Sequence, residues 1–205
     1  AHGKVASNDY LAVKDARTAH HLTVYSHLTV NSLVKAVLPD YQITQRDWYA
    51  AVAKDQSPHW TKPFRDYEYD NEIGVAFSSP AFNRTGQFVG VVASELHLNE
   101  LNKSLEKFKP NPESILLIVN EKDELISSSV PSLTRSMLAG GKHSQLNLQT
   151  LENTPLPVVV AASRTLKAHD HTGLQFFSSG NEEYYVDAFP VTDRDGILHW
   201  TGIVI

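Results

Sequence analysis

The chain has 205 residues, of which 41% are hydrophobic and 20% are charged, and this composition excludes disorder as the default. Its formal net charge is −5, and the absence of a basic stripe argues against a nucleic-acid-binding surface. No apolar run approaches the roughly twenty residues that span a bilayer, and no signal leader opens the chain. We therefore expect a soluble piece or a trimmed part of a longer protein.

Two further features bear on the origin of the chain. It contains no cysteine, which fits an oxidising compartment and fits a bacterial cytosolic protein almost as well. Residues 201–205 resemble a core strand without a polar tail, which favours trimming.

The first expected elements are weakly marked. Residues 22–37 alternate in places between apolar and polar side chains, a pattern that leaves strand and helix open. Asp47 then precedes residues 48–54, which we expect to form a short N-capped helix that ends before Ser57-Pro58. Residues 58–71 contain two prolines and are expected to form a loop.

A repeated motif dominates the rest of the chain. The pattern Pro-x-x-x-Arg-x-Gly occurs at residues 80–86 and again at residues 190–196, each time between two strand-like runs. Proline has no N–H and is expected to end the ladder, Asn or Asp to start the turn, and Gly to take the positive-φ position. Two such hairpins indicate that one small α/β module was built twice.

An expected helix and a proline-containing segment that ends it lie between the two copies of the hairpin motif. The apolar residues that recur at helical spacing are Leu98, Leu101, Leu105 and Phe108. Asn99 is a plausible cap, and the two prolines in residues 109–112 end the helix. We therefore place one module in residues 1–110 and the other in residues 111–205.

The second module predicts a strand at residues 114–119, a turn at 121–124 and a strand at 125–127. A short helix is expected from about Ser132 to Gly140-Gly141. Further strands are expected at residues 158–162, 174–177 and 184–189. This order resembles a PAS-like sheet, so the predicted fold class is α+β, with two tandem PAS-like modules, each an antiparallel sheet with flanking helices. Such a sheet offers one concave face for a small molecule.

The densest group of polar and aromatic side chains lies in the first module, at Tyr41, Arg46, Trp48 and Tyr49. An arginine offers a planar fork of donors that matches a carboxylate, and tyrosine and tryptophan add an O–H and an N–H. The alternative is a surface pair of Arg46 with a neighbouring aspartate, beside ordinary core aromatics. No comparable cluster is evident beside residues 190–196.

Two carboxylates are candidates for the opposite wall of such a pocket. Asp66 follows the expected loop, and Glu95 interrupts an apolar run near the end of a strand that should face the core. A buried carboxylate needs a partner, and a ligand ammonium would serve. Glu95 could equally cap the following helix or face solvent.

A metal site is the weaker alternative. His169 and His171 flank Asp170 and could ligate a metal, but the pattern lacks a third ligand and lies in an apparent loop. These residues carry the rival hypothesis, a small metal-dependent hydrolase. The chain contains none of the common nucleotide-binding or hydrolase motifs.

Taken together, these motifs resemble those of the double-Cache family, the extracytoplasmic sensor domains of bacterial transmembrane receptors. The resemblance covers nearly the whole chain from about residue 24. The motifs that carry it are Pro39-Asp40-Tyr41, Arg46-Asp47-Trp48-Tyr49, Trp60 with Pro63-Phe64-Arg65-Asp66, Ser79-Pro80 with Gly86, Gly90-Val91-Val92-Ala93-Ser94-Glu95-Leu96, and the hairpin of residues 184–205.

The resemblance also implies a set of ligand-binding residues. In the amino-acid-binding subset of the family, Tyr, Arg, Trp and Tyr grip the ligand carboxylate and backbone, and later Tyr and Asp residues hold the ammonium. The positions that match by type and order are Tyr41, Arg46, Trp48, Tyr49 and Asp66. Phe64 stands where a Tyr is usual, and Glu95 stands where an Asp is usual. A smaller ligand or a different amine is therefore among the expectations.

The function implied by this resemblance is ligand sensing for a bacterial inner-membrane receptor, in the periplasm. The first module would be membrane-distal and bind an amino acid or amine, and the second would be membrane-proximal. A sensor histidine kinase is the first expectation for the parent, with a diguanylate cyclase or a chemoreceptor as alternatives. The resemblance implies no catalysis, cofactor or metal in this fragment, and a membrane-anchored, homodimeric parent.

Overall fold

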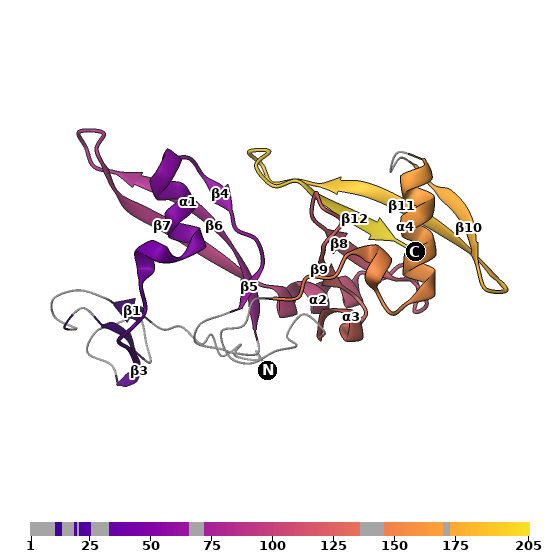
Figure 1. Ribbon diagram of the computed structural model, residues 1–205, viewed down its shortest axis with the longest axis horizontal. Coiled ribbons are helices and arrows are strands. Elements are labelled where there is room, and N and C mark those ends of the chain that lie inside the picture. The colour runs from indigo at the N-terminus through magenta and orange to yellow at the C-terminus, as the bar shows by residue number, and fades with distance from the viewer. Residues whose placement is uncertain are drawn as a thin grey trace, which may run out of the picture. The chain divides into compact units, whose positions relative to one another are not determined.

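The computed structural model describes residues 11–13, 19, 21–25, 33–65, 72–135, 146–169 and 173–205 (Figure 1). The chain forms two compact units, residues 1–46 and 47–205. The second unit contains two antiparallel sheets, so the mixed helix-and-sheet class predicted from the sequence is confirmed.

The smaller unit is built on a three-stranded antiparallel sheet in the order β1-β2-β3. The ambiguous alternation of residues 22–37 therefore resolves into strands. The strands are β1 (Leu11–Val13), β2 (Leu22–Tyr25) and β3 (Val34–Leu38), and the 3₁₀ helix η2 (Ile43–Gln45) follows them.

The first sheet of the larger unit is centred on a long hairpin. Strand β6 (Ile73–Phe82) pairs with β7 (Phe88–His97) from Gly74 to Phe82 along one edge. The short strands β4 (His59–Trp60) and β5 (Phe64–Arg65) pair with the other edge of β6. Helix α1 (Asp47–Asp55) confirms the short helix predicted at residues 48–54, and it packs against β6 and β7.

The second sheet has five strands in the order β10-β11-β12-β8-β9, which places the first and last strands of the module side by side. Helix α4 lies against β10 and β11 of this sheet (Figure 1). The elements are β8 (Leu116–Val119), β9 (Leu125–Ser128), α3 (Pro131–Arg135), η4 (Leu151–Asn153), α4 (Pro157–Ala168), β10 (Gln175–Ser179), β11 (Glu182–Val191) and β12 (Trp200–Val204).

The strand expected at residues 158–162 is wrong, because these residues lie in α4. Pro157 occupies the first turn of the helix, where a missing N–H has no effect. The buried residues of α4 are Val159, Ala162, Ser163 and Leu166, a helical spacing that the run of β-branched valines concealed.

Both repeated hairpins are present, and both turns are organised by the same side-chain position. Asn83 Oδ1 accepts the backbone N–H groups of Thr85 and Gln87, at 3.0 and 2.9 Å. Asp193 Oδ1 accepts those of Ile197 and Leu198, at 2.7 and 3.1 Å. The turn glycines, Gly86 and Gly196, have φ values of 78° and 67°, as the motif predicts.

The prolines of the motif do not end the ladders. Pro80 pairs with Val91 inside β6, and Pro190 pairs with Thr201 inside β11. At Pro80 and Pro190 the strand has a described neighbour on one edge and none on the other. A proline that points its missing N–H toward the unpaired edge costs the sheet no backbone hydrogen bond.

The two sheets of the larger unit contribute to one buried core. Ile73 and Val75 of β6 belong to the same apolar cluster as Leu117 of β8 and Val186 of β11. Helix α2 (Leu98–Lys107) joins this core through Leu98, so the predicted amphipathic helix is confirmed.

Two details of the predicted α2 differ. The residue before the helix is His97, not the expected cap Asn99, and it makes no side-chain capping bond. Phe108 is 75% exposed instead of buried, because the helix ends one residue earlier. The predicted module boundary near residue 110 lies inside the larger unit and stays a prediction.

A hydrogen bond connects the second hairpin to the first sheet. The indole N–H of Trp60, on β4, donates to Asp193 Oδ2 at 3.0 Å. The Trp60 ring also packs against Phe77 and Trp200, with centroid distances of 5.3 and 5.9 Å. The indole hydrogen bond is the main reason that the pKa of Asp193 lies below its ordinary value of 3.8, and burial partly opposes this effect.

We predict that Asp193→Asn lowers the urea midpoint, because an amide NH₂ cannot accept the indole proton while its oxygen still holds the turn. Since the folded-state pKa lies below the unfolded one, ionised Asp193 stabilises the fold at neutral pH, and this contribution is lost as the pH falls through the folded value, below 3.8. The gap between wild type and variant should therefore narrow as the pH falls below 3.8. Asn83→Asp in the other hairpin is the matched control, and an equal effect of the two changes would contradict the prediction.

Candidate functional site

Two of the predicted ligand residues lie in the smaller unit. The guanidinium carbon of Arg46 sits 5.4 Å from the centroid of the Tyr41 ring, a distance that allows a cation–π contact. Both side chains are half-buried. The contact places the Arg46 guanidinium over the Tyr41 ring, and both side chains carry hydrogen-bond donors of the kind that bind a carboxylate.

Trp48 and Tyr49 lie in the first turn of α1 and are both half-buried. Their rings meet edge to face, with centroids 5.7 Å apart and planes at 76°. The fully buried residue of the helix is Val52, one turn further on. The two aromatic residues therefore lie at the margin of the helix contact and not at its centre.

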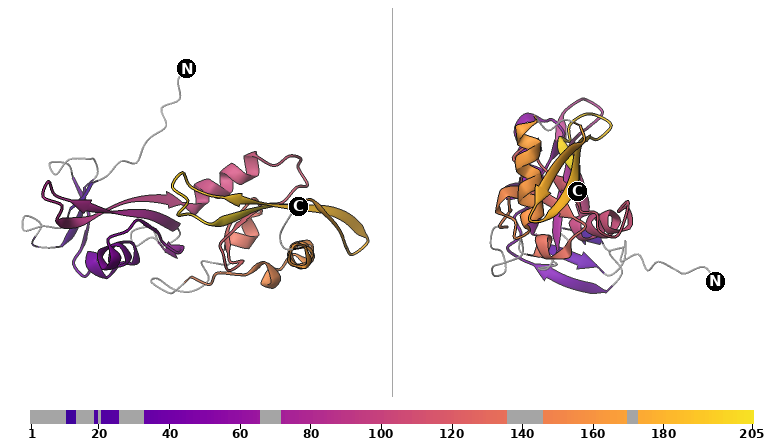
Figure 2. Two further views of the ribbon diagram at one scale, coloured as in Figure 1. Left: turned by 90° about the horizontal axis from the view of Figure 1, so that it is seen from above. Right: turned by 90° about the vertical axis from the view of Figure 1, so that its right-hand side faces the viewer.

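The strand face that α1 covers can be identified from the core. Val52 is fully buried but lies outside the apolar cluster that contains Ile73 and Val75 of β6. Since successive side chains point to opposite faces of a strand, α1 covers the face that carries Gly74, Ala76 and Ser78. The view from above shows α1 along one side of the hairpin (Figure 2).

The α1-facing side of β6 is lined by small residues. Gly74, Ala76 and Ser78 are all buried, and none of the three has a large side chain. The hydroxyl oxygen of Ser78 is buried without a hydrogen-bond partner among the described residues. This face therefore combines small side chains with a buried hydroxyl that has no described partner.

Glu95 belongs to this same face and is exposed, which agrees with the solvent-facing alternative and not with the buried one. It pairs with Ala76, and directly opposed residues share a face. The strand is exposed here because β7 is an edge strand that pairs only with β6 among the described strands. A Cβ built on Gly74 would lie 2.0 Å from Glu95 Oε1, so the carboxylate lies directly over the glycine.

Phe64 also lies beside Gly74. It pairs with this glycine from β5, so the Phe64 ring and the Glu95 carboxylate share the α1-facing side of the sheet. His97 pairs with Gly74 from β7 and contacts Glu72 at 2.6 Å. Asp66, the other predicted carboxylate, lies outside the described residues.

Of the seven predicted residues, the structure thus brings together Phe64 and Glu95 on one sheet face, and places Trp48 and Tyr49 on the helix that covers this face. The carboxylate is suited to an ammonium group, because it is exposed, flanked by an aromatic ring and set over a residue without a side chain.

The metal-site alternative finds no support in the described part of the chain. His169 Nδ1 lies 2.9 Å from the carbonyl oxygen of Thr165, at the end of α4. Asp170 and His171 lie outside the described residues. Among those that are described, no three His, Cys, Asp or Glu side chains are placed to hold a metal ion.

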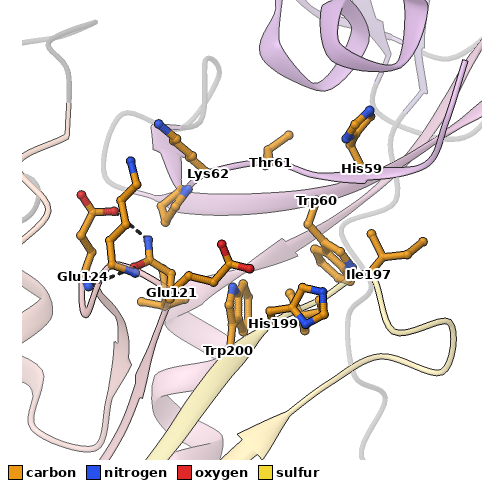
Figure 3. A pocket seen from close by; sticks show the side chains of 14 residues that line it. His59, Trp60, Thr61, Lys62, Glu121, Glu124, Ile197, His199 and Trp200 are labelled. Atoms are coloured by element: carbon orange, nitrogen blue, oxygen red, sulfur yellow. Dashed lines mark hydrogen bonds between the residues drawn. The ribbon is translucent and has the colours of Figure 1, made fainter. Parts of the chain in front are cut away.

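A second concave site was missed by the sequence analysis. A cavity of about 260 Å³ opens between the segment that contains β4, the β8–β9 turn and the start of β12 (Figure 3). Its aromatic residues are Trp60 and Trp200, and its charged residues include Lys62, Glu121 and Lys122. The expectation that residues beside the second hairpin form no cluster is therefore wrong.

The missed residues come from three segments far apart in the sequence, so no local spacing could reveal them. The only available signal was the aspartate of the second turn, at the position where the first turn has Asn83. An aspartate has a second acceptor oxygen, and this oxygen holds Trp60 at the cavity wall.

Comparison with known proteins supports a sensor-domain fold. Residues 4–103 match the family model described as the first PDC sensor domain of methyl-accepting-chemotaxis-protein-like receptors. None of the curated protein sequences matches the chain.

Several solved structures share the fold. The ligand-binding domain of the amino-acid chemoreceptor PctC of Pseudomonas aeruginosa, in complex with GABA, is 20% identical with a TM-score of 0.55, over 83% of this chain and 65% of that one. That of CtaA of Pseudomonas fluorescens, with L-serine, is 16% identical with a TM-score of 0.55, over 94% and 70%. The sensory domain of Tlp3 of Campylobacter jejuni, with isoleucine, is 14% identical with a TM-score of 0.56, over 97% and 66%. The chain thus spans about two thirds of the length of these solved chains.

The contact between Gly74 and Glu95 gives a prediction for stability. Gly74→Ala should lower the free energy of unfolding by about 1 kcal/mol, because the new methyl group displaces the glutamate. In a Glu95→Ala background the same change should be neutral or slightly stabilising, since a glycine in a strand interior is itself unfavourable. Urea unfolding of the four proteins measures this coupling. A similar loss in both backgrounds would show that the glutamate is not the obstacle.

Proposed function

We propose that the chain is the extracytoplasmic ligand-sensing region of a membrane receptor of the chemoreceptor type. The observation that carries this proposal is the match of residues 4–103 to a chemoreceptor sensor-domain family, since this range contains all seven predicted ligand residues. The finer identification with the double-Cache family rests on the sequence motifs, and the two-sheet architecture supports it.

The ligand class that fits the residues is an amino acid or a small amine. Arg46 and Tyr41 would hold a carboxylate through charged and hydroxyl hydrogen bonds, and Trp48 and Tyr49 would contribute an indole N–H and a hydroxyl. Glu95, with Asp66, would neutralise an ammonium. The ligands of the related structures, GABA, L-serine and isoleucine, all carry both groups, which supports this class.

Gly74 and Glu95 refine this expectation. Glutamate is one methylene longer than aspartate, and the missing side chain at Gly74 gives its carboxylate room to lie flat against the strand. Phe64 lacks the hydroxyl that tyrosine would supply, so the ammonium would depend more heavily on Glu95. We therefore infer a preference for ligands whose amine reaches this point, such as a short or ω-amino acid.

The receptor type follows from the same family. The comparisons give no support to a histidine kinase, the first expectation from the sequence, and favour a methyl-accepting chemoreceptor. In this proposal the fragment has no catalytic activity and needs no cofactor, and the parent is membrane-anchored, dimeric and periplasmic in this part. Within the described residues, no helix is both long and apolar enough to cross a bilayer.

Signalling would proceed by a population shift. A ligand that contacts both α1 and the β6–β7 face favours conformations in which the helix closes on the sheet, and only this differential affinity can shift the equilibrium. Strand β4 is linked to the end of α1, because Asp55 Oδ2 and His59 Nε2 lie 2.8 Å apart. Movement of α1 would therefore reach β4.

A ligand is first identified by calorimetry with a panel of amino acids and amines. We predict that Arg46→Ala and Glu95→Gln each weaken its binding about tenfold or more, because each change removes one charged hydrogen bond. Arg84→Ala and Glu183→Gln are the controls, since both side chains are exposed and lie away from α1. Loss of carboxylate recognition in one variant and of amine recognition in the other would assign the two ends of the ligand. A panel without any binding, or binding unaffected by either change, would contradict the proposal.

A further inference from the structure

The cavity between β4, the β8–β9 turn and the start of β12 contains complementary groups that the proposed function does not use. We propose that it is a second ligand site, specific for a small zwitterion whose ammonium lies between Glu121 and the indoles of Trp60 and Trp200 and whose carboxylate meets Lys62 and Lys122 (Figure 3). This inference does not depend on the ligand proposed for the α1-facing site.

The aromatic wall is fixed in place before any ligand arrives. Trp60 is held by its indole hydrogen bond to Asp193 and by its packing against Phe77. Trp200 lies at a centroid distance of 5.9 Å from Trp60, with the ring planes at 54°, so the two indoles form a corner. Indole faces attract cations, and a preorganised corner loses little entropy on binding.

The acidic group is presented by a rigid turn. Asn120 Oδ1 accepts the backbone N–H groups of Lys122 and Glu124, and its amide donates to Glu124 Oε2 at 2.7 Å. Glu124 is therefore occupied in holding the turn. Glu121 makes no hydrogen bond or ion pair with any described residue, and its carboxylate points toward the tryptophan side of the cavity (Figure 3).

The basic groups lie at the opposite end of the lining. Lys62 follows β4 and Lys122 belongs to the β8–β9 turn, and both side chains are exposed. Neither ammonium forms an ion pair within the described ranges, whereas Lys167 contacts both Asp123 and Glu152. Two unpaired ammonium groups with one unpaired carboxylate match a zwitterion better than a simple cation, which the lysines would repel.

The size of the cavity limits the ligand. A volume of about 260 Å³ corresponds to roughly nine water molecules and lies just below the range of drug-sized sites. Ile126 and Leu198 supply a buried apolar floor for the body of the molecule. The site therefore fits a betaine or a small amino acid, and not a peptide or a nucleotide.

Because the lining comes from both sheets of the larger unit, a bound zwitterion would hold them together. It would stabilise the folded chain by mass action, and the stabilisation would grow with the logarithm of the ligand concentration above the dissociation constant. It would also place the indole rings of Trp60 and Trp200 in contact with a charged group, which makes tryptophan fluorescence a direct readout.

The sequence allows a clean fluorescence experiment. The chain contains three tryptophans, Trp48, Trp60 and Trp200, so Trp48→Phe leaves only the two in the cavity wall. Glycine betaine is the zwitterionic probe, choline tests an ammonium without a carboxylate, and acetate tests a carboxylate alone. We expect saturable fluorescence changes with betaine at millimolar concentration, and at least tenfold weaker responses with the other two.

Variants then assign the response to the cavity. Glu121→Gln and the double change Lys62→Gln with Lys122→Gln should each weaken the betaine response by about tenfold or more, while Glu106→Gln on the exposed side of α2 leaves it unchanged. Calorimetry on the chain with all three tryptophans repeats the comparison without relying on Trp48→Phe. Arg46→Ala should leave betaine binding at the cavity intact.

Three results would overturn the inference. The first is no response to betaine or to a panel of small amino acids in the Trp48→Phe protein and none in calorimetry. The second is a response that Glu121→Gln leaves unchanged. The third is a response abolished by Arg46→Ala but not by Glu121→Gln, which would assign the ligand to the residues predicted from the sequence motifs and leave the proposed sensory function standing.

Discussion

The carboxylate of Asp193 is the group on which the arrangement of the larger unit depends. One oxygen closes the turn of the second hairpin through two backbone N–H groups, and the other accepts the indole proton of Trp60. A half-buried indole N–H without an acceptor is unfavourable, so this bond fixes the position of β4 relative to the second hairpin. It also orients the ring that lines the cavity, and it lowers the pKa of the aspartate because a hydrogen bond to the carboxylate favours the charged form.

The two copies of the hairpin differ in the second polar atom of the side chain that organises the turn. Asn83 and Asp193 occupy the same position and organise their turns through the same side-chain oxygen. The second polar atom of Asn83 is an amide nitrogen, and it donates to Gln87 within its own turn. That of Asp193 is an oxygen, and it reaches a residue 133 positions away in the sequence. The difference between an asparagine and an aspartate at this position thus separates a turn that bonds only within itself from a turn that also contacts the other sheet.

The sequence predicted the elements whose signals are local. Helix α2 followed from leucines at helical spacing, and both turns followed from glycine at a position that requires positive φ. Helix α4 was missed because three consecutive valines suggest a strand, although tertiary burial of one helical face outweighs their propensity. The sequence left a buried and a solvent-facing Glu95 open, and the position of β7 at the edge of the described sheet explains why the residue is exposed.

The candidate sites show the same division between local and long-range information. The resemblance predicted Phe64 and Glu95 by their positions, although both differ in residue type from the family pattern, and only the register of β5, β6 and β7 shows that they lie on one face beside Gly74. The cavity residues had no local signature, since three separate segments create the site.

A short series of contacts joins the two proposed sites. The carboxylate of Asp55, at the end of α1, holds His59 of β4, and the next residue, Trp60, is held by Asp193 at the cavity. Strand β4 is therefore tied at one end to the helix that covers the first site and at the other to the wall of the second. Any displacement of β4 on binding at one site changes the free energy of binding at the other, and thermodynamic linkage requires this coupling to be equal in both directions. The short, two-residue β4 is the element through which two ligands would influence one another.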